Sequence, residues 1–494
     1  MEPLGTITKY YPFIDEEIQK TLNSIMEKSS SYFDFVRRLS TVVLEDEAPS
    51  DLVYIAVAQT WLVKEHDLIK PITKKYENLA CIKLWKTSFN ALHYLMRDEY
   101  QKIREAMDGV IESSVADWMV VEQFLTHAVN LNMPLESIRY LSIAQEMISQ
   151  KSDLQCFEPL VQISEGRYTW REGNLAGAIT HIQRGLKLAR DHDDAVYEYF
   201  SLLMLANHWK LRNHQEGLDI FEQAYQIAQT LEVPFFISEI LNDSSMAYEI
   251  AGEYDLAISS QVHGLNSFDG DVGNEICYVI LSRLYAALGD GQQALDWADR
   301  AMKSPSKFTA HLKKARALIL LNRFDEAEQT LDIVHRKVLE AGLDLPLSRY
   351  YYISGLLEMA KGELRTAQSF LEQSYEIASQ RKSSIYLNDT LIALAQVELA
   401  LLKESGSNAA VTAGKWLSTL ENHAQTYDLP GISMQAAMIK SEMFQSQGQL
   451  MDAHETLQQA LEISDSPGVN TLRKRISARI SEIRRLMLDE EMVS

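Results

Sequence analysis

The 494-residue sequence is poor in the residues that build disulfide-rich, turn-rich or disordered proteins. It contains only 3 cysteines, 11 prolines and 21 glycines. Cys81, Cys156 and Cys277 are far apart, odd in number and form no CxxC pair, which argues against a disulfide framework and against a thiolate zinc site. The scarcity of glycine and proline argues against a disordered chain and against many tight β-turns.

Positive charge is also in short supply. The chain has 47 lysines and arginines against 69 aspartates and glutamates, a formal net charge of −22. Because such a surface repels phosphate backbones, nucleic acid is a poor partner candidate, and basic peptides or basic protein surfaces are better ones. The same charge also serves the plainer purpose of keeping a long chain soluble.

Long apolar runs are missing as well. No run approaches 18 residues, and the stretch Ala317–Leu321 is short and lies between Arg316 and Asn322. The first residues, MEPLGTITKYYPFIDEE, lack the basic start and apolar core of a signal peptide. These absences predict a cytoplasmic protein that does not insert into a membrane.

What the sequence does contain is helical periodicity and a repeat. Strand signals are nearly absent, while apolar residues recur at i, i+3, i+4 and i+7 over most of the chain. One phrase returns: a small or polar residue, Gly or Asn, a polar residue, an aromatic residue or Leu, two residues, and Ala. The clearest copy is Ala251–Ile258. Others are Gly173–Ala178, Asn213–Gly217, Gly289–Ala294, Asn322–Ala327, Gly362–Ala367 and Gly448–Ala453.

Each part of the phrase has a mechanical reason. Gly or Asn ends a first helix in the left-handed conformation, which costs other residues more. The Ala, here called the anchor, begins a second helix where two backbones come closest. A bulky residue mostly follows the anchor by four positions (Ile182, Phe221, Leu331, Leu371, Leu457), and a small one by seven (Gly185, Ala224, Gly264, Ala301, Ala460).

This pattern resembles the tetratricopeptide repeat family over about residues 85–465. The anchors 178, 217, 257, 294, 327 and 367 are spaced by 33 to 40 residues, and one more unit, with Ala413 as its anchor, fits before 453. Because the usual unit has 34 residues, the chain is most similar to long-unit members such as kinesin light chains and bacterial sensor arms. The resemblance implies an all-α, right-handed superhelical solenoid of antiparallel helix pairs, about ten in number, clearest at 160–465.

Two terminal regions flank the predicted array. Residues 1–84 form a divergent helical region, either degenerate repeats or a separate domain, with helices expected at Ile14–Lys28, Ser31–Val43, Asp51–Glu65 and Leu68–Leu84. Residues 466–494 form a capping helix, Ser466–Met487, and a short acidic tail. One face of this helix is apolar (Leu472, Ile476, Ile480, Ile483, Leu486). Its opposite, basic face is interpreted as a solvated cap, as a docking face or as a self-association contact with the acidic body.

The unit between anchors 367 and 453 departs from the phrase. We expect its helices at Ser384–Leu402 and Val411–His423, separated by a Gly/Ser break at Ser405–Ser407.

A search for catalytic chemistry finds none. The sequence has no GxxxxGK[ST] loop, no GxGxxG after a strand, no HExxH and no GxSxG. The acidic segment Asp269–Glu275 resembles a calcium loop, but Asn274 and Ile280 stand where an EF-hand needs Gly and Glu. It and Asp191–Asp194 are therefore interpreted as loops with helix N-cap residues. The sequence predicts no enzyme, no cofactor and no metal site.

The family resemblance also suggests where a partner binds. First helices line the concave side of such solenoids, and the starts Leu241-Asn242-Asp243 and Leu387-Asn388-Asp389 resemble the Leu-Asn-Asn starts of kinesin light chains, where asparagines bind a peptide backbone. Asp243 and Asp389 replace the second Asn, which removes a donor and favours basic segments. Counting back eleven residues from the anchors adds Arg167, Met246, Arg283 and Arg316, unless these are ordinary exposed residues paired with acids.

The predicted function is a non-catalytic scaffold or adaptor that binds other proteins or peptides in the concave groove. The alternative is a ligand- or peptide-sensing regulatory solenoid that acts on a separate effector. The sequence leaves homo-oligomerisation open.

Overall fold

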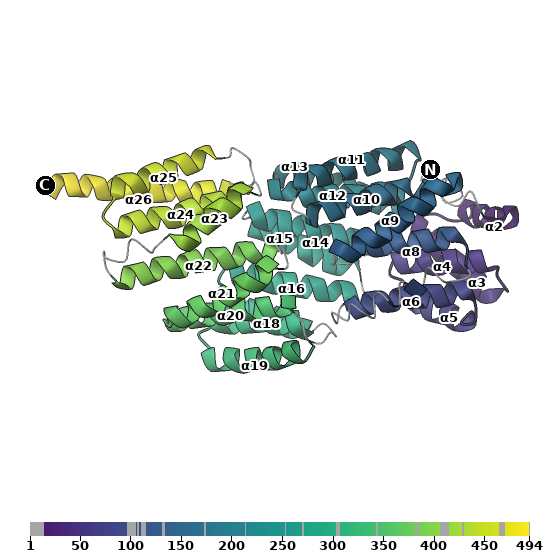
Figure 1. The fold of residues 1–494 in the computed structure, drawn as a ribbon, viewed down its shortest axis with the longest axis horizontal. Coiled ribbons are helices and arrows are strands. Elements are labelled where there is room, and N and C mark those ends of the chain that lie inside the picture. Colours follow the sequence, from purple (N-terminus) through teal and green to yellow (C-terminus); the bar gives the residue numbers. More distant parts are fainter. Residues whose placement is uncertain are drawn as a thin grey trace. The chain divides into compact units, whose positions relative to one another are not determined.

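The computed structural model describes residues 14–95, 105, 108–109, 115–130, 134–171, 174–212, 214–251, 253–268, 271–302, 307–341, 344–380, 384–405, 414–426, 429–463 and 470–493. Helices are the only regular structure in these residues (Figure 1). Their bounds are α2 Glu16–Glu27, α3 Tyr32–Glu45, α4 Ser50–Leu62, α5 His66–Lys75, α6 Ala80–Leu95, α8 Asp117–Asn130, α9 Pro134–Gln150, the 3-10 helix η1 Ser152–Phe157, α10 Glu158–Arg171, α11 Leu175–Asp191, α12 Ala195–Arg212, α13 His214–Leu231, α14 Pro234–Ala251, α15 Tyr254–Ser267, α16 Asp271–Ala287, α17 Gly291–Ala301, α18 Lys307–Leu320, α19 Phe324–Ala341, α20 Asp344–Lys361, α21 Leu364–Gln380, α22 Ser384–Ser405, α23 Lys415–Thr426, α24 Pro430–Ser446, α25 Leu450–Glu462 and α26 Asn470–Val493.

The chain divides into two compact units. Unit 1 comprises Met1–His208 and Asp219–Ile240, and unit 2 comprises Trp209–Leu218 and Leu241–Ser494. The prediction of an all-α fold is confirmed for the described residues. The boundaries predicted after residues 84 and 465 separate repeat-like from divergent sequence, whereas the two units are separated by compactness. The predicted boundaries therefore stay predictions.

Within each unit, helices pack in sequential pairs. In unit 2, α16 packs on α17, α18 on α19, α20 on α21 and α24 on α25, each across a short connection (Figure 1). The first helices also contact one another, α16 with α18, α18 with α20, α20 with α22 and α22 with α24. This two-level packing is that of a solenoid, in which each unit contacts its neighbours.

The N-terminal helices of unit 1 follow the same rule. Besides sequential contacts, α3 packs on α5, α4 on α6 and α6 on α8. The helices of residues 16–95 therefore stack by alternate contact as the later pairs do, although they lack the repeat phrase.

The anchor residues lie where the steric argument places them. The alanine anchors among the described residues are fully buried. The bulky residues predicted four positions after an anchor and the small residues predicted seven positions after it are buried as well. Ala413 lies outside the described residues. The buried anchors are Ala178, Ala257, Ala294, Ala327, Ala367 and Ala453, followed by the buried Ile182, Phe221, Leu331, Leu371 and Leu457 at four positions and Gly185, Ala224, Gly264, Ala301 and Ala460 at seven.

Four of the predicted left-handed residues between paired helices are also confirmed, and the other three, Gly173, Asn213 and Gly252, lie outside the described residues. Gly289, Asn322, Gly362 and Gly448 have φ of 80°, 57°, 84° and 75°. After each of them, the next N–H donates to the carbonyl five residues earlier, at 2.9 Å in all four turns, which is the bond that closes a Schellman cap. One geometry therefore joins all four pairs.

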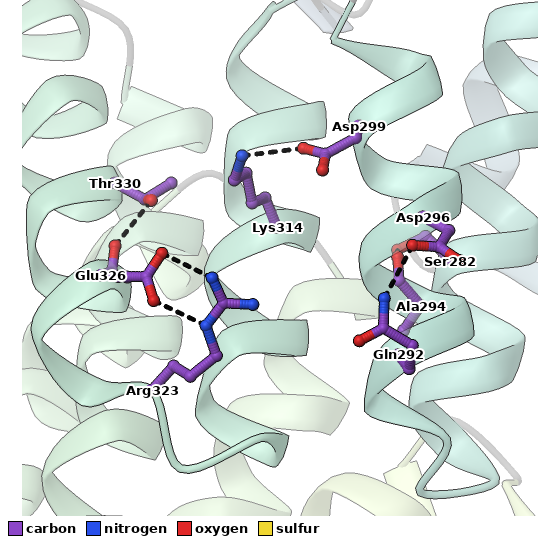
Figure 2. Close-up of polar contacts among 9 residues, drawn as sticks. All are labelled: Ser282, Gln292, Ala294, Asp296, Asp299, Lys314, Arg323, Glu326 and Thr330. Atoms are coloured by element: carbon purple, nitrogen blue, oxygen red, sulfur yellow. Dashed lines mark hydrogen bonds and ion pairs between the residues drawn. The ribbon is translucent and has the colours of Figure 1, made fainter.

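A further small position, not predicted from the sequence, accompanies each alanine anchor of the described residues, but not Gly217, where Leu205 occupies it. It lies twelve residues before the anchor, on the first helix. There, Ser282 donates its hydroxyl to the Ala294 carbonyl at 2.7 Å (Figure 2), and Ser441 does the same to Ala453 at 3.1 Å. Gly355 takes this position before Ala367, and a Cβ added to it would come within 2.6 Å of Leu371. The full set in the described pairs includes Gly166, Ser245, Ser282, Ala315, Gly355 and Ser441.

Gly217 is the one described anchor that is not alanine, and the structure explains it. A Cβ at this position would lie 2.8 Å from the backbone nitrogen and 2.9 Å from the Cα of Lys210. Real Cβ atoms do not approach backbone so closely, so even the alanine methyl group does not fit here. The departure from the repeat phrase thus reflects a closer approach of α12 and α13.

The predicted helix Leu68–Leu84 is wrong as a single helix. It is divided into α5 and α6 by a turn at residues 76–79. The buried Tyr76 side chain holds this turn, since its hydroxyl lies 2.9 Å from the Val43 carbonyl and 2.8 Å from the Asp46 carbonyl. These tertiary hydrogen bonds override a helical apolar pattern. The other three N-terminal helices agree with prediction to within a few residues at each end.

Helix α23 begins at Lys415, later than the predicted Val411, and residues 411–413 lie outside the described part of the chain. Glu398, on α22, caps this start. Its carboxylate accepts hydrogen bonds from the backbone N–H groups of Lys415, Trp416 and Leu417 at 3.1 to 3.2 Å. A long-range carboxylate therefore satisfies the donors that a local N-cap would satisfy elsewhere.

The C-terminal helix closes the stack as predicted, with different bounds. Helix α26 packs on α24 and α25 through its apolar stripe, and residues 466–469, where it was expected to start, lie outside the described residues. Ile476, Ile480 and Ile483 are buried, whereas Leu486 is 38% exposed. None of the described helices is both long enough and apolar enough to cross a membrane.

Replacing Gly217 by alanine should destabilise the chain by about 1–3 kcal/mol, because the added methyl group overlaps the backbone of Lys210. The matched control is Gly431→Ala on α24, where the nearest atom to an added Cβ, in Leu472, is 3.8 Å away. This control should be neutral or slightly stabilising, since alanine restricts the unfolded chain. Chemical denaturation of both variants measures the difference, and equal stabilities would refute the steric explanation.

Replacing Glu398 by alanine should destabilise the pair α22–α23 by about 1–2 kcal/mol, because three helix N–H groups lose their acceptor. Glu404→Ala, an exposed position on the same helix, serves as control. Hydrogen exchange of the Lys415, Trp416 and Leu417 amides reports the effect locally. Unchanged protection of these amides in Glu398→Ala would show that the cap contributes nothing.

Candidate functional site

The predicted site residues fall in both units, and each unit is described by itself. Arg167 lies on α10 in unit 1, half-buried, with its Nη1 3.7 Å from the Met204 sulfur of α12. The other seven lie in unit 2, on α14, α16, α18 and α22. The structure thus gathers most of the predicted residues on first helices of a single unit.

The two predicted asparagines are engaged by neighbouring helices. Asn242 is 7% exposed, and its Oδ1 accepts a hydrogen bond from the buried Cys277 thiol of α16 at 3.0 Å. Asn388 is half-buried, and its Oδ1 lies 2.7 Å from His423 Nε2 on α23. Burial lowers the pKa of His423, so its neutral ring can donate this bond through Nε2–H. That either amide binds a peptide backbone stays a prediction.

A row of polar side chains begins on α12 and α14. Lys210 Nζ lies 3.8 Å from the Met246 sulfur, and the Asp243 carboxylate is near enough to favour the charged lysine. Burial has the larger effect and lowers the pKa of Lys210. One turn further along α14, Glu249 forms an ion pair with Arg283 of α16 at 2.8 Å.

The row continues over α18, α20 and α22. Arg316 donates through Nη1 to the Tyr352 hydroxyl at 3.2 Å. Arg349, three residues before Tyr352, forms an ion pair with Asp389 at 2.9 Å, and its guanidinium lies 5.5 Å from the centre of the tyrosine ring. Lys313 lies three residues before Arg316 on the same helix. We call the whole set the first-helix row: Lys210, Asp243, Met246, Glu249, Arg283, Lys313, Arg316, Arg349, Tyr352 and Asp389.

Most of the first-helix row is partly accessible to solvent although it is framed by helices, whereas Lys210 and Tyr352 are buried. The side chains of Glu249 and Arg349 are 17% and 20% exposed, and that of Asp389 is 46% exposed. Lys313 and Arg316 have intermediate exposure. These groups are therefore reachable by a partner and are at the same time partly desolvated.

Positive charge exceeds negative charge in the row. It holds five cations and three carboxylates, and two of the carboxylates are committed to Arg283 and Arg349. In the described residues, Lys313 and Arg316 take part in no ion pair. Burial lowers the pKa of Lys313 well below its usual range, and the neighbouring guanidiniums of Arg349, Arg283 and Arg316 lower it further. Like charges are thus held together at the centre of the row.

Sequence reasoning found about half of this row. Counting back eleven residues from the anchors identified Met246, Arg283 and Arg316, but Glu249 and Lys313 were missed. Each lies three residues from a predicted one, which places it on the same face of the helix. Arg349 and Tyr352, also missed, repeat this spacing on α20. Extending each predicted position by one helical turn would have identified Glu249 and Lys313, but not Lys210, Arg349 or Tyr352, since no predicted position lies on α12 or α20.

The described residues contain no group of three or more His, Cys, Asp or Glu side chains arranged to hold a metal ion.

No family model and no curated protein matches the chain in sequence. Among solved structures, it is similar to yeast Tom70, with 13% identity, 95% of each chain covered and a TM-score of 0.48. It is similar to the apo form of the quorum sensor NprR from B. thuringiensis, with 15% identity, 71% of this chain and 99% of that chain covered and a TM-score of 0.45. It is similar to a tetratricopeptide repeat protein from Parabacteroides merdae, with 14% identity, 65% and 99% covered and a TM-score of 0.34.

At these identities and scores the likeness concerns helical architecture and carries no information on what this chain binds. The helix pairs, buried anchors and repeated turns of the described residues make the chain a tetratricopeptide-like solenoid, as its sequence predicts.

Replacing Lys313 by methionine should stabilise unit 2 at neutral pH, by on the order of 1 kcal/mol, because it removes a desolvated cation that Arg283, Arg316 and Arg349 repel and only Asp389 attracts. The folded-state pKa lies below the unfolded value of 10.5, so between these values the unfolded chain binds more protons. The penalty from Lys313 is therefore full at low pH and disappears as pH rises toward 10.5.

Thermal unfolding of wild type and Lys313→Met at pH 7 and pH 10 measures this difference. The gain in melting temperature should be larger at pH 7. Lys314→Met is the matched control, since Lys314 is next in sequence but forms an ion pair with Asp299 at 2.8 Å (Figure 2). A Lys313→Met variant less stable than wild type at pH 7 would contradict the predicted repulsion.

Proposed function

We propose that the first-helix row of unit 2 binds a segment of another protein, so that the chain acts as a non-catalytic interaction scaffold. The observation that carries the proposal is the continuity of the row. Six first helices, α12, α14, α16, α18, α20 and α22, each contribute at least one polar or charged side chain.

The dimensions of the row suit a peptide rather than a small molecule. Packed helices lie about 8–10 Å apart, so six first helices in succession span roughly 40–50 Å. An extended chain advances about 3.3 Å per residue, and roughly 12–15 residues would cover the row. A small ligand would contact only one or two of the helices.

The chemistry of the row also suits a peptide. A peptide unit offers an N–H donor and a carbonyl acceptor, and the row provides both carboxylates, such as Asp389, and donors, such as Arg316. The partial exposure of these groups leaves them available for new contacts. Solenoids of stacked helix pairs use such extended surfaces for binding.

A sensing role is the second candidate, and the repulsion around Lys313 favours it. A segment that neutralises these cations would stabilise the liganded arrangement of α16, α18 and α20 relative to the free one, and binding of this kind shifts a conformational equilibrium. The scaffold and sensor readings share the same site, and they differ in whether binding changes the packing of the helices.

A selection from a random peptide display library on the full-length chain tests the shared site. Selected peptides should bind a Met246→Ala/Asp389→Ala double variant at least about tenfold more weakly, because contacts at both ends of the row are lost. The control is Leu256→Ala/Asp332→Ala, which removes an exposed leucine and an exposed aspartate from the second helices α15 and α19.

Fluorescence anisotropy with labelled peptides gives the affinities, and circular dichroism verifies that both variants are folded. Equal loss of binding in the two double variants, or none in either, would place the site elsewhere. Hydrogen exchange of α16–α20 with and without peptide separates the two candidates, since only a sensor should change protection beyond the contacted residues.

A further inference from the structure

The centre of the first-helix row differs from its ends in charge balance. At one end Glu249 neutralises Arg283, and at the other Asp389 neutralises Arg349. Between these ion pairs lie Lys313 and Arg316, for which the described residues supply no ion pair. The protein thus holds two adjacent cations, on one turn of α18, without the carboxylate that accompanies each cation beside them.

Tyr352 completes the centre. It is 8% exposed, and burial raises the pKa of its hydroxyl, which is therefore protonated at neutral pH. The hydroxyl oxygen accepts a hydrogen bond from Arg316 at 3.2 Å, so its own proton points elsewhere and can be donated. An ammonium, a guanidinium and a phenol, all donors, thus lie on two adjacent helices.

We propose that Lys313, Arg316 and Tyr352 bind a carboxylate of the segment held by the first-helix row. This inference rests on the proposed function and adds the chemistry of the partner. A carboxylate is acceptor-only and takes up to four hydrogen bonds, which matches a site made only of donors. It also adds negative charge to a cluster in which Asp389 offsets only part of the repulsion on Lys313, in a partly desolvated place where a charge-assisted hydrogen bond is strong.

Binding of an acidic partner gives a physical reason for cations that destabilise the free protein. Holding Lys313 beside three guanidiniums costs stability in the free protein, and the attraction of Asp389 offsets this cost only in part. A bound carboxylate relieves the repulsion and gains ion pairs at once. The relief of repulsion and the new ion pairs both increase the affinity for an acidic partner, and neither contributes to the binding of a neutral one.

The proposal differs from what overall charge suggests. A net charge of −22 favours basic partners on average, and the preference for basic segments stays a prediction for the acidic parts of the surface. The centre of the row has the opposite sign, so the segment that binds there carries at least one acidic group.

Peptides selected as above provide the probe. Each selected peptide is resynthesised with its carboxylates replaced one at a time, Asp by Asn, Glu by Gln and the C-terminal carboxylate by an amide. One replacement should weaken binding to the wild-type chain on the order of tenfold to a hundredfold. Which replacement does so distinguishes a side-chain carboxylate from a C-terminal one.

A double-mutant cycle assigns the carboxylate to its site. In Lys313→Met/Arg316→Met, the same replacement should have no further effect, whereas in Lys314→Met it should weaken binding as in wild type. The bound peptide should also protect the Lys313 amine, but not the Lys314 amine, from acetylation by acetic anhydride, read by mass spectrometry.

The possible failures are distinguishable. The carboxylate site is refuted if peptides bind the row but replacing their carboxylates does not weaken binding. It is also refuted if the carboxylate replacement weakens binding equally in wild type and in Lys313→Met/Arg316→Met. In both cases the proposed function stands. If inorganic phosphate alone protects Lys313 and no peptide does, the inference is overturned. If no selected peptide depends on Met246 and Asp389, both proposals fail together.

Discussion

The fold depends on one close approach, repeated along the chain, between the carbonyl of an anchor residue and the first helix that precedes it. Where the facing residue is serine, as at Ser282, its hydroxyl donates to that carbonyl, and where it is Gly355 the leucine four residues after the anchor fills the space. Both solutions need a small residue on each side. Because interiors tolerate neither voids nor overlap, this contact fixes the spacing of each helix pair.

The same contact determines which side chains face outward from the first helices. Once the small residue twelve positions before the anchor is turned toward the second helix, the residue next to it is directed along the row. Arg283 and Arg316 follow Ser282 and Ala315 directly and so share one register on α16 and α18. The alignment of charges over successive helices is thus a consequence of packing, and only the choice of residue at each place is free.

The anchors could be predicted from sequence because they are local: a turn, a small residue and an apolar spacing lie within a dozen residues. What could not be predicted depends on distant partners. The break between α5 and α6 exists because Tyr76 finds carbonyls near Val43, and the start of α23 depends on Glu398 from the preceding helix. The sequence of the copy Asn213–Gly217 has Gly where the other copies have Ala, but the cause, the backbone of Lys210, is a tertiary contact. For the site, the faces of the helices were predictable and the balance of charge across them was not.

Charge balance shows why composition is a poor guide to a binding surface in a solenoid. The acidic excess is a sum over all residues of the chain. The row on the first helices is a small set framed by neighbouring helices, where partial desolvation strengthens each interaction. A few cations there outweigh many distant carboxylates, since exposed charges beyond about 8–10 Å are largely screened by salt. Specificity in such a protein is therefore decided by the few groups, like Lys313, whose charge the fold compensates only in part.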